Sequence, residues 1–228
     1  MKQELSTRLK TVASYVKAQS KVADIGCDHA YLPIYLIQKN KAGQVIGSEI
    51  AQGPLENGRS NVLRYGLQDK IELRYGGGLD TIEKEDGIDT VTIAGMGGKT
   101  IVSILADAFE RGVLPVNQLV LQPNTDEWFV RFWLWQHGYQ ITDETILDEK
   151  NNTYEVIVAE YIGKIVTYTR EDILFGPYLR QNKNAIFCQK YKRELEGLKR
   201  IINHIPKHSA RYHYVKNHLE SIEVMLNE

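Results

Sequence analysis

The stretch VADIGCDHAYLP, residues 22–33, decides the fold of this chain. Its first residues form a short β-type run that ends at Gly26, and Pro33 suits the first turn of a helix. A strand that passes through a glycine turn into a helix is typical of nucleotide sites in doubly wound α/β sheets. A dinucleotide site would place further glycines in this turn, but here those positions hold Asp28 and Tyr31. The stretch therefore predicts a nucleotide-type fold whose ligand is not a dinucleotide.

Acidic residues flank the glycine of this turn. Asp24 precedes Gly26 and Asp28 follows it. In a site of low dielectric constant, carboxylates repel a phosphate by several kcal/mol and attract a cation. S-Adenosylmethionine is a nucleoside that carries an ammonium and a sulfonium group and no phosphate. We therefore expect S-adenosylmethionine as the cofactor.

Strands and helices alternate along the first 137 residues. Strands are expected at 21–25, 44–48, 71–74, 90–93 and 119–121, and helices at 5–18, 33–39, 54–65, 99–111 and 126–137, the first with Ser6 as its cap. This alternation predicts an α/β fold with a parallel, doubly wound, Rossmann-like sheet. Two further strands at 139–147 and 154–161 have no helix between them, and they predict an antiparallel hairpin at one edge of the sheet.

Other candidate cofactor residues follow the later strands. Glu49 lies 23 residues after Gly26, which is the register of an acid that holds ribose hydroxyls. GGGL at 76–79 ends the third strand, where its backbone would contact the adenine edge, and AGMGG at 94–98 would line the floor below the sulfonium. The expected cofactor-binding residues are Asp24, Gly26, Cys27, Asp28, Glu49, Ile50, Gly77, Gly78, Leu79, Ala94, Gly95, Met96 and Gly97.

The C-terminal part of the chain has a different pattern. Apolar residues at 195, 198, 202 and 205, and again at 215, 219, 222 and 226, recur at spacings of three and four. Pro206 and Ser209 interrupt between the two series. The pattern predicts a helical hairpin that packs as a short antiparallel coiled coil. We expect two domains, a Rossmann-like domain at 1–164 and a helical hairpin at 165–228.

The net charge of −1 conceals a strong asymmetry. Residues 180–220 hold ten Lys or Arg and three acids, an excess of +7, whereas the rest of the chain holds 18 Lys or Arg and 26 acids, an excess of −8. Such a basic segment indicates an anionic partner for the C-terminal hairpin.

Together, VADIGCDHAYLP, AGMGG and the C-terminal hairpin resemble the TrmK family, bacterial tRNA methyltransferases that act on N1 of the adenine at tRNA position 22. The likeness covers nearly the whole chain, and the DxGxDHAYLP and AGMGG blocks are its specific part. It implies a class I methyltransferase domain that uses S-adenosylmethionine and a helical extension that binds tRNA. By this resemblance Asp24, Gly26, Asp28, His29, Glu49 and the turn at 95–98 are site residues.

One feature of the chain departs from related enzymes. Many class I methyltransferases place an Asp after the third strand to bind the adenine amino group, but this chain has GGGL there, so recognition of the base would rest on backbone or on another side chain.

The expected tRNA-contacting residues are Asn124 at the end of the fifth strand and Arg180, Lys190, Lys192, Arg193, Lys199 and Arg200 in the basic segment.

The residues after the fourth strand fit methylation of a ring nitrogen. Methyltransferases of amino groups often carry Asn/Asp-Pro-Pro-aromatic there, whereas residues 94–98 offer no side-chain acceptor. N1 of adenine has an in-plane lone pair and no proton, so it needs orientation rather than deprotonation. The product base is cationic, and we expect the Asp28 carboxylate to stabilise the charge that develops. His29 and Tyr31 are expected to position the base or stack on it, which makes these three the catalytic candidates.

Structural roles compete with these functional ones. Asp28 is also suited to cap the helix that follows it, and Cys27 is better explained as a small packing residue than as a nucleophile. The basic face of the hairpin also fits a solvated helix surface. Two other functions stay open: a methyltransferase for a small molecule or another RNA, and a non-catalytic RNA-binding protein. A nicotinamide-dependent oxidoreductase fits least, because the turn at 22–33 has no GxGxxG.

The composition bounds the setting of the protein. No run approaches the roughly 18 apolar residues that a membrane span needs, and the N-terminal residues lack a signal-peptide core. The two cysteines are 161 positions apart and belong to no Cys/His cluster, so neither a disulfide framework nor a metal site is expected. We expect a cytoplasmic protein with no membrane partner, and a monomer rather than an oligomer.

Overall fold

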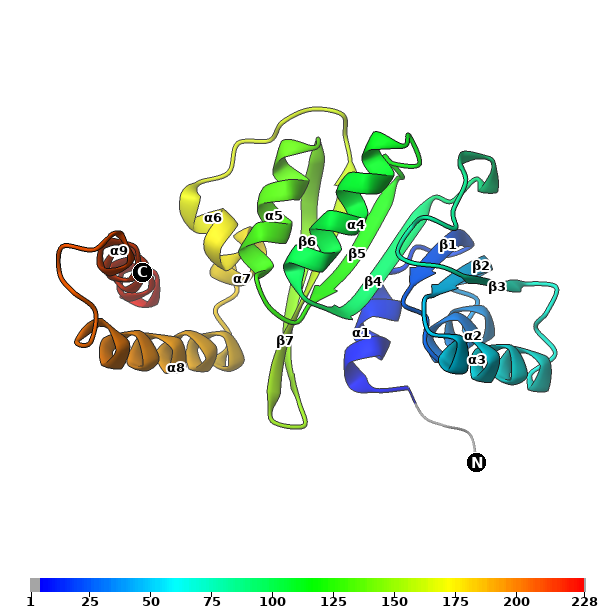
Figure 1. Cartoon of the computed structure of the whole chain (residues 1–228), viewed down its shortest axis with the longest axis horizontal. Helices are drawn as coiled ribbons and strands as arrows, with labels where there is room; N and C mark the ends of the chain where they lie inside the picture. The colour runs from blue at the N-terminus through cyan, green and yellow to red at the C-terminus, as the bar shows by residue number, and fades with distance from the viewer. Residues whose placement is uncertain (1–4, 228) are drawn as a thin grey trace.

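Residues 5–227, which the computed structural model describes, form one seven-stranded sheet with helices on both faces (Figure 1). The strand order is β3-β2-β1-β4-β5-β7-β6. β1 to β5 are parallel, and β7 runs antiparallel to both of its neighbours, β5 and β6. The strands are β1 (Ser20–Ile25), β2 (Ala42–Glu49), β3 (Ile71–Tyr75), β4 (Thr90–Met96), β5 (Gln118–Pro123), β6 (Tyr139–Glu149) and β7 (Asn152–Tyr161). The predicted α/β sheet and its antiparallel hairpin at one edge are confirmed.

Alternate residues of the strands face two apolar clusters. Val120 of β5 belongs to a cluster with α1, α2 and α3, whereas its neighbours Leu119 and Leu121 belong to a cluster with α4 and α5 on the opposite face. Both faces of the central strands are therefore buried, as is usual for a parallel sheet. The helices are α1 (Thr7–Tyr15), α2 (Tyr31–Gln38), α3 (Gln52–Arg64), α4 (Gly98–Glu110) and α5 (Glu127–Gln136), with a short 3-10 turn at Lys84–Asp86.

Local sequence sets the ends of these helices. The Ser6 hydroxyl accepts a hydrogen bond from the Leu9 N–H at 3.2 Å, which confirms the predicted cap of α1. α1 ends at Tyr15, three residues before the predicted end, because Val16 is already extended and the chain must turn into β1. Pro33 lies in the first turn of α2, where its missing N–H costs no helical hydrogen bond.

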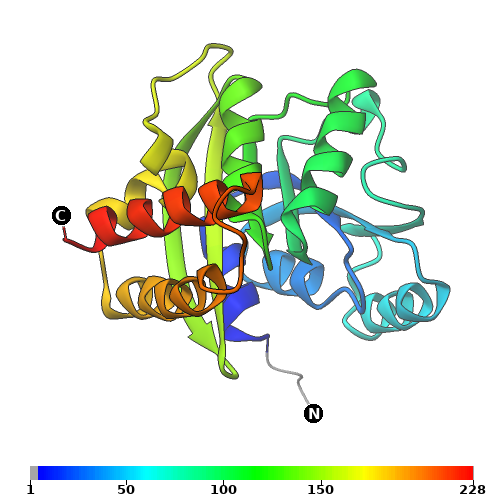
Figure 2. The same ribbon diagram turned by 60° about the vertical axis from the view of Figure 1, so that its left-hand side comes forward.

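The C-terminal part contains four helices within the described residues, two of which the sequence pattern did not predict. α6 (Arg170–Phe175) and α7 (Pro177–Gln181) precede the two expected helices, α8 (Ala185–Ile202) and α9 (Ala210–Asn227). Phe175, Leu179 and Phe187 pack with Ile146 of β6 and with α9 in a third apolar cluster. Figures 1 and 2 show α8 and α9 side by side beyond β6, at the opposite end of the sheet from β3. Coiled-coil packing and a division of the chain at 164/165 stay predictions.

A buried ion network joins α8 to the sheet. The guanidinium of Arg131 in α5 is fully buried and binds the carboxylates of Glu144 in β6 and Glu155 in β7. Lys190 of α8 binds Glu155 (Nζ–Oε1 2.7 Å) and also Glu127 of α5 (Nζ–Oε1 2.6 Å). Burial by itself would raise the pKa of Glu155, but Arg131 and Lys190 outweigh burial and lower it. The network fixes the base of α8 against the sheet.

Candidate active site

The candidate cofactor-binding and catalytic residues lie near the ends of the five parallel strands. We call this region the carboxyl edge: the segments at 26–30, 49–51, 76–80, 94–98 and 122–126, which lie at or directly after the ends of β1, β2, β3, β4 and β5. The strand register places Asp24 of β1 beside Gly47 of β2 and Thr92 of β4, so the ends of these strands lie level with one another. Ligands of open α/β sheets bind at this edge.

The turn after β1 contains three residues with left-handed backbone. Gly26 has φ +74°, and Asp28 and Ala30 have φ of 50° and 59° although neither is glycine. Each such non-glycine position costs on the order of 1–3 kcal/mol and is typical of functional turns. A Cβ on Gly26 would lie only 2.6 Å from the Cε of Met96, so the turns after β1 and β4 touch at this glycine. The two sequence blocks that carry the family resemblance therefore meet in space.

The two acids that flank Gly26 differ in exposure. The side chain of Asp28 is 61% exposed, whereas Asp24 is 4% exposed and its Oδ1 accepts a hydrogen bond from the Thr92 hydroxyl at 2.7 Å. The pKa of Asp24 is raised to about 7, chiefly by burial; the Thr92 hydrogen bond lowers it by a smaller amount, and the charge of the nearby Glu49 adds to the rise. Of this predicted pair, Asp28 presents its carboxylate to solvent, while Asp24 lies beneath the turn and titrates near neutral pH.

Glu49 ties the first two turns together. Its Oε2 accepts a hydrogen bond from the Asp28 N–H at 3.0 Å, and its Oε1 accepts one from the Ala51 N–H at 2.8 Å. A carboxylate has about four hydrogen-bond acceptor sites, so the Glu49 carboxylate can still accept hydrogen bonds from the two hydroxyls of a ribose. The next residue, Ile50, is 68% exposed, and its Cδ1 lies 3.5 Å from the point that a Cβ on Gly77 would occupy. This pair fits a nucleoside, because the fixed Glu49 carboxylate suits the ribose and the exposed Ile50 offers an apolar surface for the base.

The turn after β3 contains the predicted residues Gly77, Gly78 and Leu79. The side chain of Leu79 is buried in the core and its carbonyl accepts a hydrogen bond from Arg111, so Leu79 anchors the turn, and its contact with the cofactor stays a prediction. Gly78 packs against Ile104 with φ +54°, which only a glycine adopts readily. Asp80 was not among the predicted cofactor-binding residues. One of its carboxylate oxygens lies 4.0 Å from the point that a Cβ on Gly77 would occupy. Its signal was present in the sequence, since it directly follows GGGL.

The three catalytic candidates lie together. The Asp28 Oδ1 is 3.5 Å from the His29 Nε2, and the rings of His29 and Tyr31 have centroids 5.6 Å apart. The Asn61 side chain of α3 donates a hydrogen bond to the His29 carbonyl at 3.1 Å, which ties the backbone of this turn to α3. Cys27 is buried beside them, and burial with the charges of Asp24 and Glu49 raises its thiol pKa, so it packs rather than attacks.

The turn after β4 is held by side chains from the end of β5. The Gly95 N–H donates to Gln122 Oε1 at 3.0 Å, and the Gly95 carbonyl accepts from Asn124 Nδ2 at 2.8 Å. Asn124 is itself exposed, so the structure places this predicted substrate residue at the carboxyl edge. Gln122 and Arg8, which hydrogen bonds to it, were not predicted, because nothing in their local sequence marks them.

The basic residues predicted to bind tRNA fall into two groups. Arg180 binds Asp172 at 2.8 Å, Lys190 belongs to the buried ion network, and Lys199 binds Glu223 at 2.6 Å. The Lys190 charge is thus shared with Glu127 and Glu155, and its contact with tRNA stays a prediction. Lys192, Arg193 and Arg200 are exposed on α8. Part of the basic excess counted in the sequence therefore serves to dock the helices.

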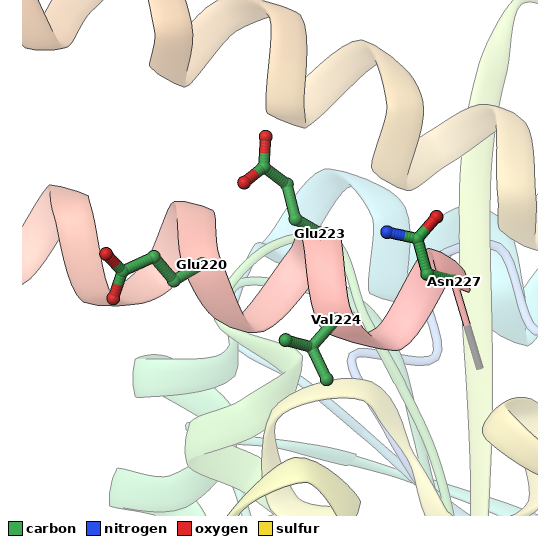
Figure 3. A pocket seen from close by; sticks show the side chains of 4 residues that line it. All are labelled: Glu220, Glu223, Val224 and Asn227. Carbon is green, nitrogen blue, oxygen red and sulfur yellow. The ribbon is translucent and has the colours of Figure 1, made fainter.

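One surface hollow lies on the C-terminal helices, away from the carboxyl edge. A hollow of about 440 Å³ on α9 is lined by Glu220, Glu223, Val224 and Asn227. Figure 3 shows Glu223 pointing toward α8 and Val224 pointing away from it, so the hollow follows the outer surface of one helix. Among residues 5–227, no group of three or more His, Cys, Asp and Glu side chains is placed to hold a metal ion, and no helix is long and apolar enough to cross a membrane.

Known proteins resemble this chain over most of its length. The model of the TrmK family, tRNA (adenine(22)-N(1))-methyltransferase, matches residues 22–224. The tRNA (adenine(22)-N(1))-methyltransferase of Bacillus subtilis is 40% identical over 206 residues, which are 89% of this chain and 86% of that protein.

Solved structures agree with this assignment. TrmK of M. capricolum in complex with S-adenosylhomocysteine is 32% identical with a TM-score of 0.89, covering 98% of each chain. A Streptococcus agalactiae protein of the NADB-Rossmann superfamily is 36% identical with a TM-score of 0.91, covering 99% of each chain. With its carboxyl edge, its C-terminal helices and these matches, the chain belongs to the TrmK family of tRNA (adenine(22)-N(1))-methyltransferases.

Proposed function

We propose that this chain transfers the methyl group of S-adenosylmethionine to N1 of the adenine at position 22 of tRNA. The observation that carries the proposal is the meeting of Gly26, Glu49 and Met96 at one edge of the sheet, in a chain whose family match spans residues 22–224. The relative from M. capricolum was solved with S-adenosylhomocysteine, the product of this cofactor.

The residues of the carboxyl edge fit S-adenosylmethionine. Glu49 would accept the ribose hydroxyls, because its carboxylate is fixed by two backbone N–H groups and still has acceptor capacity. Ile50 and Gly77 would pack on the adenine ring, with Asp80 in reach of its amino group. When bound, the cofactor supplies an activated methyl group on a sulfonium. The exposed carboxylate of Asp28 and the ionised form of Asp24 favour that positive charge.

The target adenine would be oriented by side chains rather than deprotonated. N1 is unprotonated and nucleophilic, so a rate gain comes from holding it in line with the methyl group. Tyr31 and His29 provide a ring surface beside the turn, and Asn124 presents an exposed amide of the kind that pairs with adenine edges. As the base becomes cationic, the Asp28 carboxylate stabilises it.

The C-terminal helices would hold the tRNA. N1 lies on the Watson–Crick edge, so a paired target must leave its partner at a cost of a few kcal/mol. Phosphate contacts by Lys192, Arg193 and Arg200 on α8 would offset that cost. We further propose that the enzyme works as a monomer in the cytoplasm, where its tRNA substrate is found.

The test uses unmodified tRNA transcripts, labelled S-adenosylmethionine and the purified protein. We expect label in tRNA as 1-methyladenosine and a reverse-transcription stop at position 22, because an N1 methyl group blocks base pairing. A transcript with A22 changed to G serves as the control and should stay unlabelled. Label in a small-molecule extract but not in tRNA, or label in the control transcript, would contradict the proposal.

A further inference from the structure

The turn after β4 contains a backbone bulge whose polar groups leave the sheet. Ala94 pairs with Gln122 and Met96 pairs with Pro123, so Gly95 stands between them without a partner in the ladder. Its φ of +83° is a conformation that glycine adopts readily. The N–H and C=O of Gly95 are bound instead by the side chains of Gln122 and Asn124. The shape of this turn therefore depends on two amides at the end of β5.

The amide of Gln122 is fully used and fully buried. Its Nε2 donates to the Pro123 carbonyl at 2.8 Å and to the Asn124 Oδ1 at 3.0 Å. Its Oε1 accepts from the Gly95 N–H and from the guanidinium of Arg8. Two donors and two acceptor sites are all that a primary amide offers. Gln122 thus has one orientation, and that orientation fixes Gly95 and Asn124 together.

Arg8 reaches this amide from α1, 114 residues away in the sequence. A Cβ on Gly95 would lie 3.2 Å from Arg8 Nη1, so the guanidinium lies directly against the bulge. The guanidinium of Arg8 also lies over the ring of Tyr154 in β7, with 5.3 Å between Cζ and the ring centroid. The start of α1 is held by Glu149 of β6, whose Oε1 accepts from the Thr7 N–H at 2.6 Å.

We propose that Arg8 is a positioning residue for methyl transfer, which acts through Gln122 to hold the Gly95 bulge and the exposed amide of Asn124 in one arrangement. The inference rests on the proposed function, because it assigns Arg8 a part in that reaction. A displacement of about 1 Å at a reacting centre can cost roughly 100-fold in rate. The charge-assisted hydrogen bond from Arg8 occupies the last acceptor site of the Gln122 amide, which is a strong means of preventing such a displacement.

The test compares Arg8→Met and Arg8→Lys with the wild-type enzyme on A22 tRNA. Methionine keeps an apolar stem for Tyr154 but cannot donate to Gln122, whereas lysine keeps a donor. We expect Arg8→Met to lower kcat by about 10- to 100-fold, with KM for tRNA and Kd for S-adenosylmethionine within about twofold of wild type. Arg8→Lys should recover most of kcat. Arg64→Met, at the exposed far end of α3, is the matched control and should change neither constant.

A double variant tests whether Arg8 acts through Gln122. Arg8→Met/Gln122→Leu should be no slower than Gln122→Leu alone, because the second change removes the group on which Arg8 acts. Three results would overturn the inference: a kcat for Arg8→Met within twofold of wild type, a loss confined to KM for tRNA, or a parallel loss of cofactor affinity and thermal stability. The second would make Arg8 a tRNA contact and the third a general support of the fold. A wild-type enzyme inactive on A22 would instead refute the proposed function.

Discussion

Asp24→Asn removes a carboxyl that the fold keeps partly protonated at neutral pH. Burial raises the pKa of Asp24 from 3.8 to about 7. A carboxyl with a raised pKa holds its proton more tightly in the folded protein than in the unfolded chain. The free energy of unfolding therefore falls as the pH rises between these two values, and the loss is complete above the folded pKa. At about 1.4 kcal/mol per pH unit, the total loss is about 4 kcal/mol.

Asparagine keeps an acceptor for the Thr92 hydroxyl and has no charge to bury. Asp24→Asn should therefore be more stable than wild type above pH 7, and the gap between the two should widen by about 3 kcal/mol from pH 5 to pH 8. Urea unfolding at each pH measures this gap, and effects of other titrating groups cancel in the difference. Asp69→Asn, at an exposed acid before β3, is the control and should show no such widening. A gap that stays constant from pH 5 to pH 8 would refute the assignment.

The same carboxyl should make cofactor binding depend on pH. A cation near Asp24 favours its ionised form and so lowers its pKa, and binding must then release a proton below pH 7. Wild type should bind S-adenosylmethionine several-fold more tightly at pH 7 than at pH 5.5, whereas Asp24→Asn should bind equally at both. Calorimetry in buffers of different ionisation enthalpy counts the released proton. Equal pH dependence in the two proteins would place the titrating group elsewhere.

Other substitutions separate the roles assigned to single residues. Asp28→Ala should lower kcat on tRNA by at least about tenfold without changing Tm, because the side chain is exposed, and an unchanged kcat would remove Asp28 from the mechanism. Glu49→Gln should weaken S-adenosylmethionine binding by about 10- to 100-fold in calorimetry, the worth of a hydrogen bond to a charged group; equal affinity would mean that Glu49 only fixes the turn. Lys190→Met leaves Glu155 without one of its cations and should lower the free energy of unfolding by about 3 kcal/mol. Lys192→Met should leave stability within about 0.5 kcal/mol and lower the salt dependence of tRNA binding by about one ion; the opposite pattern would reverse the roles of the two lysines.

The order of elements could be predicted because local signals mark each of them. Gly26 and Pro33 bracket the first turn, and each strand up to residue 161 was expected within a few residues of its observed bounds. α6 and α7 were missed because helices of six and five residues are too short to show a periodic apolar face. Their position depends on burial of Phe175 and Leu179 against β6, which only the folded chain reveals.

Long-range contacts limited the prediction of the site. Asp28 lies in the glycine turn after β1, and Glu49 lies at the end of β2. Their spacing from Gly26 was therefore enough to predict both. Arg8 and Gln122 meet only because α1 packs against β4 and β5, and neither residue lies in a motif. Counting charges likewise cannot separate Lys190, which is paired with acids of α5 and β7, from the exposed Lys192.

The carboxyl edge is acidic and the exposed surface of α8 is basic, so the two regions suit different ligands. A carboxyl edge with exposed and buried acids favours a cationic methyl donor and a base that becomes cationic, but it repels the phosphates of tRNA. The tRNA backbone must therefore be held away from that edge, and exposed cations are available on α8. The buried pairing of Arg131 and Lys190 with Glu155 ties α8 to the sheet. We propose that phosphate binding on α8, separate from cation binding at the carboxyl edge, lets an acidic edge methylate a polyanion.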